Sequence, residues 1–333
     1  MPPQNGADDP NQPFPTTNPD AVGSDVAAFS GIAVDEDWSQ LEPEPGQYDW
    51  TPLDASLASV SEFDQAHPTH QLAVKLRVFP GFSAPNWAKS IGGPPLSVIT
   101  NSKSGRTNTL GRWWSESYEA AWSTFQNALA ARYDHDPLIA GVQVTSCSTT
   151  TDEPFIVNAV DLPPMEAAGL TTAAYESCLQ GALRNYSGWH NTAVYFPINT
   201  MPKLDNGPKN GSIFATQIVQ QCAASASKSG PRCVIDNHGL GKTSHASFNW
   251  LSTAIDHLWQ QNPTTTLVAF QADSQTKGED CAAIVDAISD HAGSVELWQP
   301  ISGVDGYRGF AANSLADLAS WNAALRSGKP PAC

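Results

Sequence analysis

Positively charged residues are scarce in this sequence. It has 17 Lys and Arg against 33 Asp and Glu, a formal net charge of −16 over 333 residues. Nucleic acids and anionic membrane surfaces are bound by clustered Lys and Arg, so we expect neither a nucleic-acid partner nor a membrane partner. Long hydrophobic runs are missing too, and none approaches the ~20 residues that a transmembrane helix needs.

The signature motifs of several enzyme classes are also absent. The sequence contains no Cys-x-x-Cys pair, no His-Glu-x-x-His and no Gly-x-Ser-x-Gly elbow. These absences argue against a zinc site and against an α/β-hydrolase triad. His238 and His245 form no metal motif, and residues 90–95 (SIGGPP) lack the Lys-Ser/Thr of a phosphate loop. We therefore expect no metal and no cofactor.

Apolar and aromatic residues, in contrast, are abundant. Hydrophobic residues make up 41% of the chain, with 11 Trp, 12 Phe and 7 Tyr, which is enough for a large core. Charged residues are only 15%, and 24 Gly and 26 Pro interrupt the chain, so a coiled coil is not expected. Residues 1–25 are rich in Pro, Asn and Asp and predict an extended arm. No second linker follows, so residues 26–333 predict one domain.

Short apolar segments alternate with longer amphipathic segments along this domain. Such alternation implies parallel strands with helical crossovers, and it predicts an α/β fold of the (β/α)₈ TIM-barrel type. A doubly wound open sheet is the rival, but no Gly-x-Gly-x-x-Gly turn follows any strand. The eighth strand is not evident, and Phe14 or Val26–Phe29 are its candidates. The expected strands are Gly31–Asp35, Leu72–Phe79, Ile139–Thr145, Thr192–Pro197, Cys233–Asp236, Leu267–Gln271 and Ser294–Trp298. The expected helices are Leu53–Ala66, Trp114–Tyr133, Thr172–Trp189, Ser212–Ser227, Ser247–Gln261, Asp280–His291 and Leu315–Leu325.

The six cysteines allow 15 disulfide connectivities. Proximity in the sequence suggests the pairs Cys147–Cys178, Cys222–Cys233 and Cys281–Cys333. Disulfides persist in oxidising compartments, so we expect a secreted or extracellular protein. Six buried free thiols in a cytosolic protein are the alternative. The chain begins with MPPQNG rather than with a basic and apolar signal, so export would require a signal that has been removed.

A motif follows the first expected strand. Residues 38–50 read WSQLEPEPGQYDW and resemble the Trp-x-x-Leu-Glu-Pro-x-x-Gly-x-Tyr-Asp-Trp signature of TIM-barrel glycoside hydrolases, especially β-galactosidase-like members of the large retaining clan. In those families it follows the second strand, which would place the missing strand upstream. Residues 74–87 resemble their third strand with its Pro-Trp loop, and residues 296–299 resemble their eighth strand. The resemblance covers most of residues 30–300 and implies hydrolysis of O-glycosidic bonds in an oligo- or polysaccharide.

Glycoside hydrolysis usually needs two carboxyl groups: one protonates the leaving oxygen, and the other attacks the anomeric carbon or activates water. The resemblance implies an acid/base Glu just after strand four. Glu153 is the candidate, in the loop that follows residues 142–145. The sequence departs from the family here, because the usual Asn-Glu pair at the strand end is absent. An exposed loop Glu without a role is the alternative.

The second carboxylate is less evident. The resemblance places it at the end of strand seven, where this sequence has Gln271, whose amide is no nucleophile. Glu296 and Asp273 are the candidates, with Glu296 ranked first because it shares strand parity with Trp298. The alternative for Glu296 is a buried carboxylate paired with Lys75 or Arg77.

Sugar rings stack on indoles and need fixed polar partners for their hydroxyls. Three tryptophans follow expected strand ends, and Trp298 is implied by the resemblance to be the floor of the sugar site. Ordinary packing or a ligand-free loop is the alternative for these residues. The substrate-binding candidates are Trp38, Arg77, Trp87, Asn237, His238, Gln271 and Trp298.

The sequence thus predicts a secreted, monomeric, single-domain glycosidase that acts on a neutral or weakly charged saccharide. Two alternatives stay open. One is a barrel that has lost a carboxylate and only binds carbohydrate, which Gln271 motivates. The other is an inverting enzyme, whose carboxyl groups would be ~6.5–9.5 Å apart instead of ~5–5.5 Å.

Overall fold

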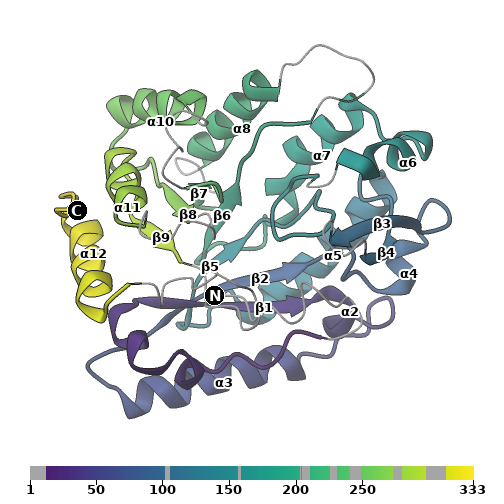
Figure 1. Ribbon diagram of the computed structural model, residues 1–333. Coiled ribbons are helices and arrows are strands. Elements are labelled where there is room, and N and C mark those ends of the chain that lie inside the picture. Colours follow the sequence, from purple (N-terminus) through teal and green to yellow (C-terminus); the bar gives the residue numbers. More distant parts are fainter. Residues whose placement is uncertain are drawn as a thin grey trace.

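The computed structural model describes residues 13–101, 106–156, 159–202, 204, 211–225, 231–240, 249–272, 280–297 and 313–333. Within these ranges seven parallel strands alternate with helices (Figure 1). The strands are β1 (Gly31–Asp37), β2 (Ala73–Phe79), β5 (Ile139–Gln143), β6 (Ala193–Pro197), β7 (Cys233–Asp236), β8 (Ala269–Gln271) and β9 (Ser294–Glu296). All seven expected strands are confirmed, with ends that differ by a few residues.

The order of the strands in space follows the chain. β1, β2, β5, β6 and β7 form one sheet in this order, and β8 pairs with β9. A parallel bridge between Ile235 and Val268 joins β7 to β8. Since strand directions are parallel and each crossover contains helix, this is the architecture of a TIM barrel.

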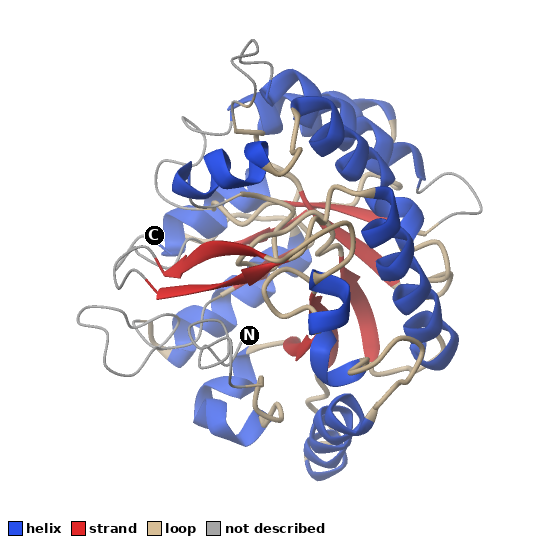
Figure 2. Ribbon diagram, turned by 90° about the vertical axis from the view of Figure 1, so that its right-hand side faces the viewer, coloured by secondary structure: helices blue, strands red, loops and turns tan. Residues whose placement is uncertain are grey.

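Helices surround the strands (Figure 2). The long helices are α3 (Thr51–Ala66), α5 (Glu116–Tyr133), α7 (Thr172–Asn185), α8 (Gly211–Ser225), α10 (Asn249–Gln261), α11 (Asp280–Ser289) and α12 (Leu315–Ser327), and each was expected. Local chemistry sets several of their ends. Ser115 and Thr171 cap α5 and α7, and Ser314 forms a capping box with Asp317 at α12; each such cap contributes about 1 kcal/mol.

A hairpin and several short helices were not expected. β3 (Leu96–Asn101) and β4 (Arg106–Leu110) pair antiparallel, and the backbone N–H of Ile99 donates to Asp161 at 2.9 Å. The short helices are α2 (Trp38–Leu41), α4 (Asn86–Lys89), η2 (Ala159–Asp161) and α6 (Leu162–Ala167). These elements lie between the barrel strands and their long helices in the sequence, so they add to the barrel without changing its order.

The segment before β1 is the main difference from expectation. Pro19–Ala28 forms the 3₁₀ helix η1, with Pro19 in its first turn and Asn18 as its N-cap, and Phe14 lies in a loop against Phe79. Neither candidate for the first barrel strand is therefore a strand. Among the described residues no backbone pairing joins β9 to β1, and we call the space between these two described strands the open seam. η1 and α12 pack together beside it.

Three disulfides cross-link the chain. They join Cys147 to Cys178, Cys222 to Cys233, and Cys281 to Cys333, which confirms the expected pairing. None of the described helices has both the length and the apolar character needed to cross a bilayer.

Candidate active site

The carboxyl ends of the strands carry a cluster of inward-facing polar side chains. The register pairs Asp35 with Arg77 and Gln271 with Glu296, so each pair points to the same side, the barrel lumen. TIM barrels usually fill these positions with bulky apolar residues, whereas this barrel buries charge. We call this set the mouth cluster: Asp35, Arg77, Gln143, Asp236, Gln271 and Glu296.

Arg77 is the hub of the mouth cluster. Its side chain is inaccessible to solvent and faces three carboxylates. Nε and Nη2 donate to the two oxygens of Asp35 at 2.6 and 3.0 Å, a bidentate pair. Nη1 donates to Asp152 at 2.9 Å and to Glu296 at 2.8 Å. The single guanidinium of Arg77, on β2, thus binds carboxylates from β1, from β9 and from the loop after β5.

Glu296 is surrounded by donors. Besides Arg77, Lys75 Nζ lies 3.2 Å from its Oε2, and Gln271 Nε2 donates to its Oε1 at 3.0 Å. Burial alone would raise the pKa of Glu296, but the Arg77 and Lys75 cations outweigh it and hold this pKa well below its usual range. Glu296 is therefore an ionised carboxylate at neutral pH.

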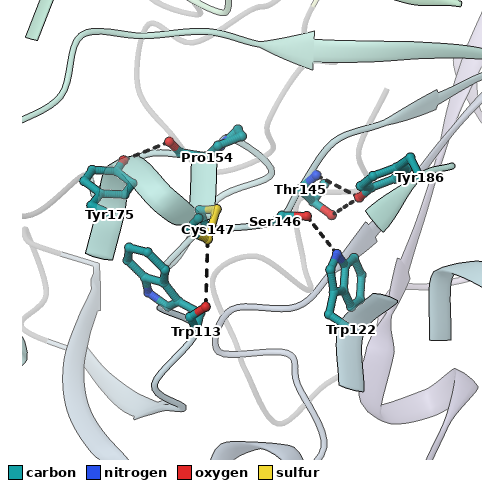
Figure 3. The surroundings of a disulfide bond; sticks show 9 residues. Trp113, Trp122, Thr145, Ser146, Cys147, Pro154, Tyr175 and Tyr186 are labelled. Carbon is teal, nitrogen blue, oxygen red and sulfur yellow. Dashed lines mark hydrogen bonds between the residues drawn. A yellow bond between two sulfur atoms is a disulfide. The ribbon is translucent and has the colours of Figure 1, made fainter. Parts of the chain in front are cut away.

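Glu153 lies in the loop after β5, and this loop is firmly held (Figure 3). The Cys147–Cys178 disulfide ties it to α7, and the Tyr175 hydroxyl donates to the carbonyl of Pro154 at 2.9 Å. The strand end beside it is held by Trp122, whose indole N–H donates to Ser146 Oγ at 2.9 Å. Covalent and hydrogen-bonded anchors on both sides give Glu153 a defined position.

The environment of Glu153 favours its protonated form. Burial raises the pKa of Glu153 to about 6, and the negative charges of Asp152 and Asp236 act in the same direction. His238 opposes them, with Nδ1 4.0 Å from Glu153 Oε1. Burial would lower the pKa of His238, but Asp152 and Asp236, 3.7 and 3.4 Å away, raise it to about 9. His238 is thus a cation among three carboxyl groups.

Two candidates for sugar contact are occupied by other interactions. Trp38 is inaccessible to solvent and packs edge-on against Trp87, Tyr118 and Trp122, with ring centroids 5.0–5.7 Å apart. This burial does not fit the expected stacking role of Trp38, because no indole face is free. Trp87 is half-buried and donates its N–H to the carbonyl of Glu42.

Asn237 is also engaged. It is buried, and its side chain donates to the carbonyl of Ile198 and accepts from the N–H of Gly239. Arg77 and Gln271 bind carboxylates, as described above. Asp273 and Trp298 lie outside the described residues.

The sequence-based choice of residues missed four members of this site: Lys75 as a site residue, Gln143, Asp152 and Asp236. Lys75 Nζ lies 2.9 Å from Asp236, and Gln143 Nε2 donates to Asp152 at 3.0 Å. Strand parity could have found three of them, since Lys75, Gln143 and Asp236 share the inward face with Arg77. No group of three or more potential metal ligands is arranged for a metal ion in the part of the chain that the structure describes.

Comparison with known proteins gives structural relatives only. No protein-family model and no curated protein matches the sequence. The structure is similar to the lactosyl-enzyme intermediate of endo-glycoceramidase II from Rhodococcus sp., with a TM-score of 0.54, 13% identity, and coverage of 92% of this chain and 74% of that one. It is also similar to the β-glycosidase BGL167, with a TM-score of 0.53, 12% identity, and coverage of 95% and 86%. The chain therefore has the fold of TIM-barrel glycosidases.

Proposed function

We propose that this protein is a glycoside hydrolase in which Glu153 is the proton donor and Glu296 is the second carboxylate. One observation carries the proposal: two carboxyl groups at the same barrel mouth have pKa values shifted in opposite directions. The pKa of Glu153 is raised to about 6, while that of Glu296 is held well below its usual range. Opposite shifts of this kind are what separates an acid from a nucleophile or base in glycosidases.

The proposed reaction uses both protonation states. The Glu153 carboxylic acid gives its proton to the glycosidic oxygen as the bond from that oxygen to the anomeric carbon breaks. The Glu296 carboxylate then forms a bond to the anomeric carbon. Alternatively, it takes a proton from a water molecule whose oxygen forms that bond. In the first case, Glu153 as carboxylate deprotonates the water that releases the sugar from Glu296, and it regains its proton. Both routes end in hydrolysis.

The saccharide class is inferred from charge and likeness. Arg77 and Lys75 pair with the carboxylates of Asp35, Asp152, Asp236 and Glu296, so neither offers a free charge to an anionic sugar. We therefore infer a neutral oligo- or polysaccharide as substrate. The glycosidase fold supports this class, and the three disulfides support an oxidising, extracellular location.

A carbohydrate-binding barrel without hydrolysis is the second candidate function. It is favoured by the hydrogen bonds of Glu296, whose carboxylate oxygens accept from Arg77, Lys75 and Gln271. A carboxylate with so many donors is a weakened nucleophile. Gln271 also stands where the resembled families keep their nucleophile, and an amide cannot replace it.

An activity screen separates the two functions. A panel of aryl glycosides and neutral polysaccharides would be tested with the wild-type protein, Glu153→Gln, Glu296→Gln and the exposed control Glu62→Gln. Turnover that is lost in the first two variants and kept in the control supports a hydrolase. Saccharide binding by calorimetry without turnover by the wild type would instead support the binding function. The anomer released first, read by NMR, distinguishes retention from inversion.

A further inference from the structure

A cavity of about 270 Å³ lies beside the lumen and extends from the beginnings of β1 and β2 to Glu296, at the carboxyl end of β9. Its walls include the first residues of β1, β2 and β8, the whole of β9 and one side of α12. It therefore occupies the open seam between β9 and β1, where α12 passes in Figure 1. Of the two carboxyl groups proposed for hydrolysis, Glu153 is not among the lining residues, whereas Glu296 lines the inner end of the cavity.

The cavity exists because the inward-facing residues at this level are small. In place of the branched residues that usually fill a TIM barrel, the lining has three alanines, a glycine and a serine. We call these the lower layer: Ala33, Ala73, Gly141, Ala269 and Ser294. A side chain at Gly141 would collide with the ring of Tyr195, so the glycine makes room for this ring in the wall of the cavity. The three alanines and the serine are small enough to leave the cavity open.

The remaining walls are largely apolar. They come from the strands at the seam and from the face of α12 that is turned to the barrel. The main apolar groups are Phe29, Phe270, Val295, Leu318, Trp321 and Leu325. A binding site with such walls gains free energy by removing an apolar ligand body from water.

The inner end of the cavity is polar but electrically balanced. Lys75 Nζ faces it over the ring of Tyr195, 4.8 Å from the ring centroid. Two of its three N–H donors are taken by Asp236 and Glu296; the third has no hydrogen-bond acceptor among the described residues. A charged ligand would disturb this balance, whereas a neutral hydroxyl or carbonyl oxygen would accept the third N–H.

The outer end has a polar rim. Asn322 of α12 donates to the carbonyl of Ala28 at 2.8 Å, and its Oδ1 accepts from the Ser30 hydroxyl at 3.1 Å. Arg326 also reaches Ser30. These bonds join α12 to the chain just before β1, so the rim gives the cavity a definite entrance beside an apolar interior.

We infer that this cavity is a binding site for a small neutral molecule with an apolar body and one oxygen acceptor directed at Lys75. The volume is not quite twice that of an apolar cavity of about 150 Å³ that takes up benzene. The ligand class is therefore a one- or two-ring compound, or an alkyl alcohol of similar bulk. This site meets the proposed sugar site at Lys75 and Glu296, but its apolar walls do not include Glu153, and its existence does not depend on hydrolysis.

Calorimetric titration with 2-naphthol tests the inference, with naphthalene as the probe that lacks the acceptor. The wild type should bind one equivalent of 2-naphthol saturably and more tightly than naphthalene. Ala33→Leu and Ala269→Leu fill the cavity from β1 and from β8, and each should weaken binding by roughly tenfold or more. Ala173→Leu adds the same volume on the exposed side of α7 and should leave binding unchanged.

The inference would be overturned by any of these results: no saturable binding to the wild type, binding that survives both filled variants, or naphthalene binding as tightly as 2-naphthol. Thermal unfolding of each variant verifies that loss of binding is not loss of fold. Ala33→Val or Ala269→Val, each a smaller filling residue, serves if the leucine variant at the same position does not fold. Competition with a saccharide would place the probe at the barrel mouth and would also overturn it.

Discussion

The two ends of this barrel lumen differ sharply in chemistry. The mouth cluster buries an arginine, carboxylates and amides around Arg77, whereas the lower layer consists of Ala, Gly and Ser around a cavity. Lys75 lies between them and touches both, since it pairs with Glu296 and also faces the cavity. Most TIM barrels fill the lumen with one kind of residue, bulky and branched.

Neither end of the lumen is explained by its contribution to the free energy of folding. Burying charges costs free energy that even well-made ion pairs repay only partly, and leaving a cavity forfeits packing contacts. Neither end of the lumen is therefore what stability alone would favour. The helices, the aromatic cluster around Trp38 and the disulfides must supply the missing stability from outside the lumen.

The largest expected effect is at the mouth. Glu153→Gln keeps the shape of the side chain and removes the titrating proton. For substrates with poor leaving groups we expect turnover to fall on the order of 10²–10⁴-fold, and less for activated aryl glycosides, which need little protonation. Steady-state kinetics beside the control Glu62→Gln measure this. Near-normal hydrolysis of a natural saccharide by Glu153→Gln would reject the assignment.

Removal of the hub should have the next largest effect. Arg77→Met leaves Asp35, Asp152 and Glu296 without their common cation, and we expect the free energy of unfolding to fall by about 3–5 kcal/mol. Denaturant unfolding measures it. The matched control is Arg132→Met, which breaks the solvent-exposed pair with Asp54 and should have no measurable effect. Equal losses in both variants would show that the network around Arg77 adds no stability.

The sequence predicts features that depend on neighbouring residues better than features that depend on contacts between distant positions. The seven strands and the long helices follow from local patterns of apolar residues, so they were predicted. The contact of Arg77 with Glu296 spans 219 positions, and strand parity gives the direction of each side chain but not its partner across the lumen. Glu296 was ranked as a candidate with just this ion pair as the alternative, and the structure contains the ion pair.

The differences between expectation and structure have physical reasons as well. Trp38 was expected at the sugar site because it follows a strand end, but α2 begins at this residue and turns the indole into the aromatic core. The segment Val26–Phe29 was a strand candidate, yet Pro19 and the Asn18 cap start a 3₁₀ helix that runs to Ala28. The hairpin of β3 and β4 was missed because Gly and Pro precede it and the expected barrel pattern has no place for it.

Loss of a disulfide should have an effect of intermediate size on the free energy of unfolding. Cys147–Cys178 lies at the mouth and Cys222–Cys233 at the start of β7, and their sequence separations are 31 and 11. Replacing each pair by alanine should lower the free energy of unfolding by about 4 and about 3 kcal/mol in the chain-entropy account. Only loss of the first pair should also lower turnover below the unfolding temperature, because it releases the Glu153 loop. Equal turnover in both variants would contradict this.

The pH dependence of turnover should report the charges around Glu153. Activity requires the protonated acid, so turnover should fall as pH rises through about 6, the raised pKa of Glu153. His238 lowers the pKa of Glu153, so His238→Gln should move this alkaline limb upward, by on the order of one pH unit. His257→Gln, on the exposed side of α10, is the control. A limb that moves downward in His238→Gln would contradict the assigned charge of His238.

The smallest expected effect belongs to the lower layer. Ala269→Val adds two methyl groups beside the cavity, where there is room, and valine suits a strand, so we expect the free energy of unfolding to change by less than about 1 kcal/mol. Ala182→Val makes the same change in the packed interior of α7, where overpacking should cost about 1–3 kcal/mol, of which helix propensity explains about half a kcal/mol. Denaturant unfolding of both variants measures the difference. If Ala269→Val is as destabilising as Ala182→Val, the lower layer is tightly packed in solution, and the contrast between the two ends of the lumen reduces to the charges of the mouth cluster.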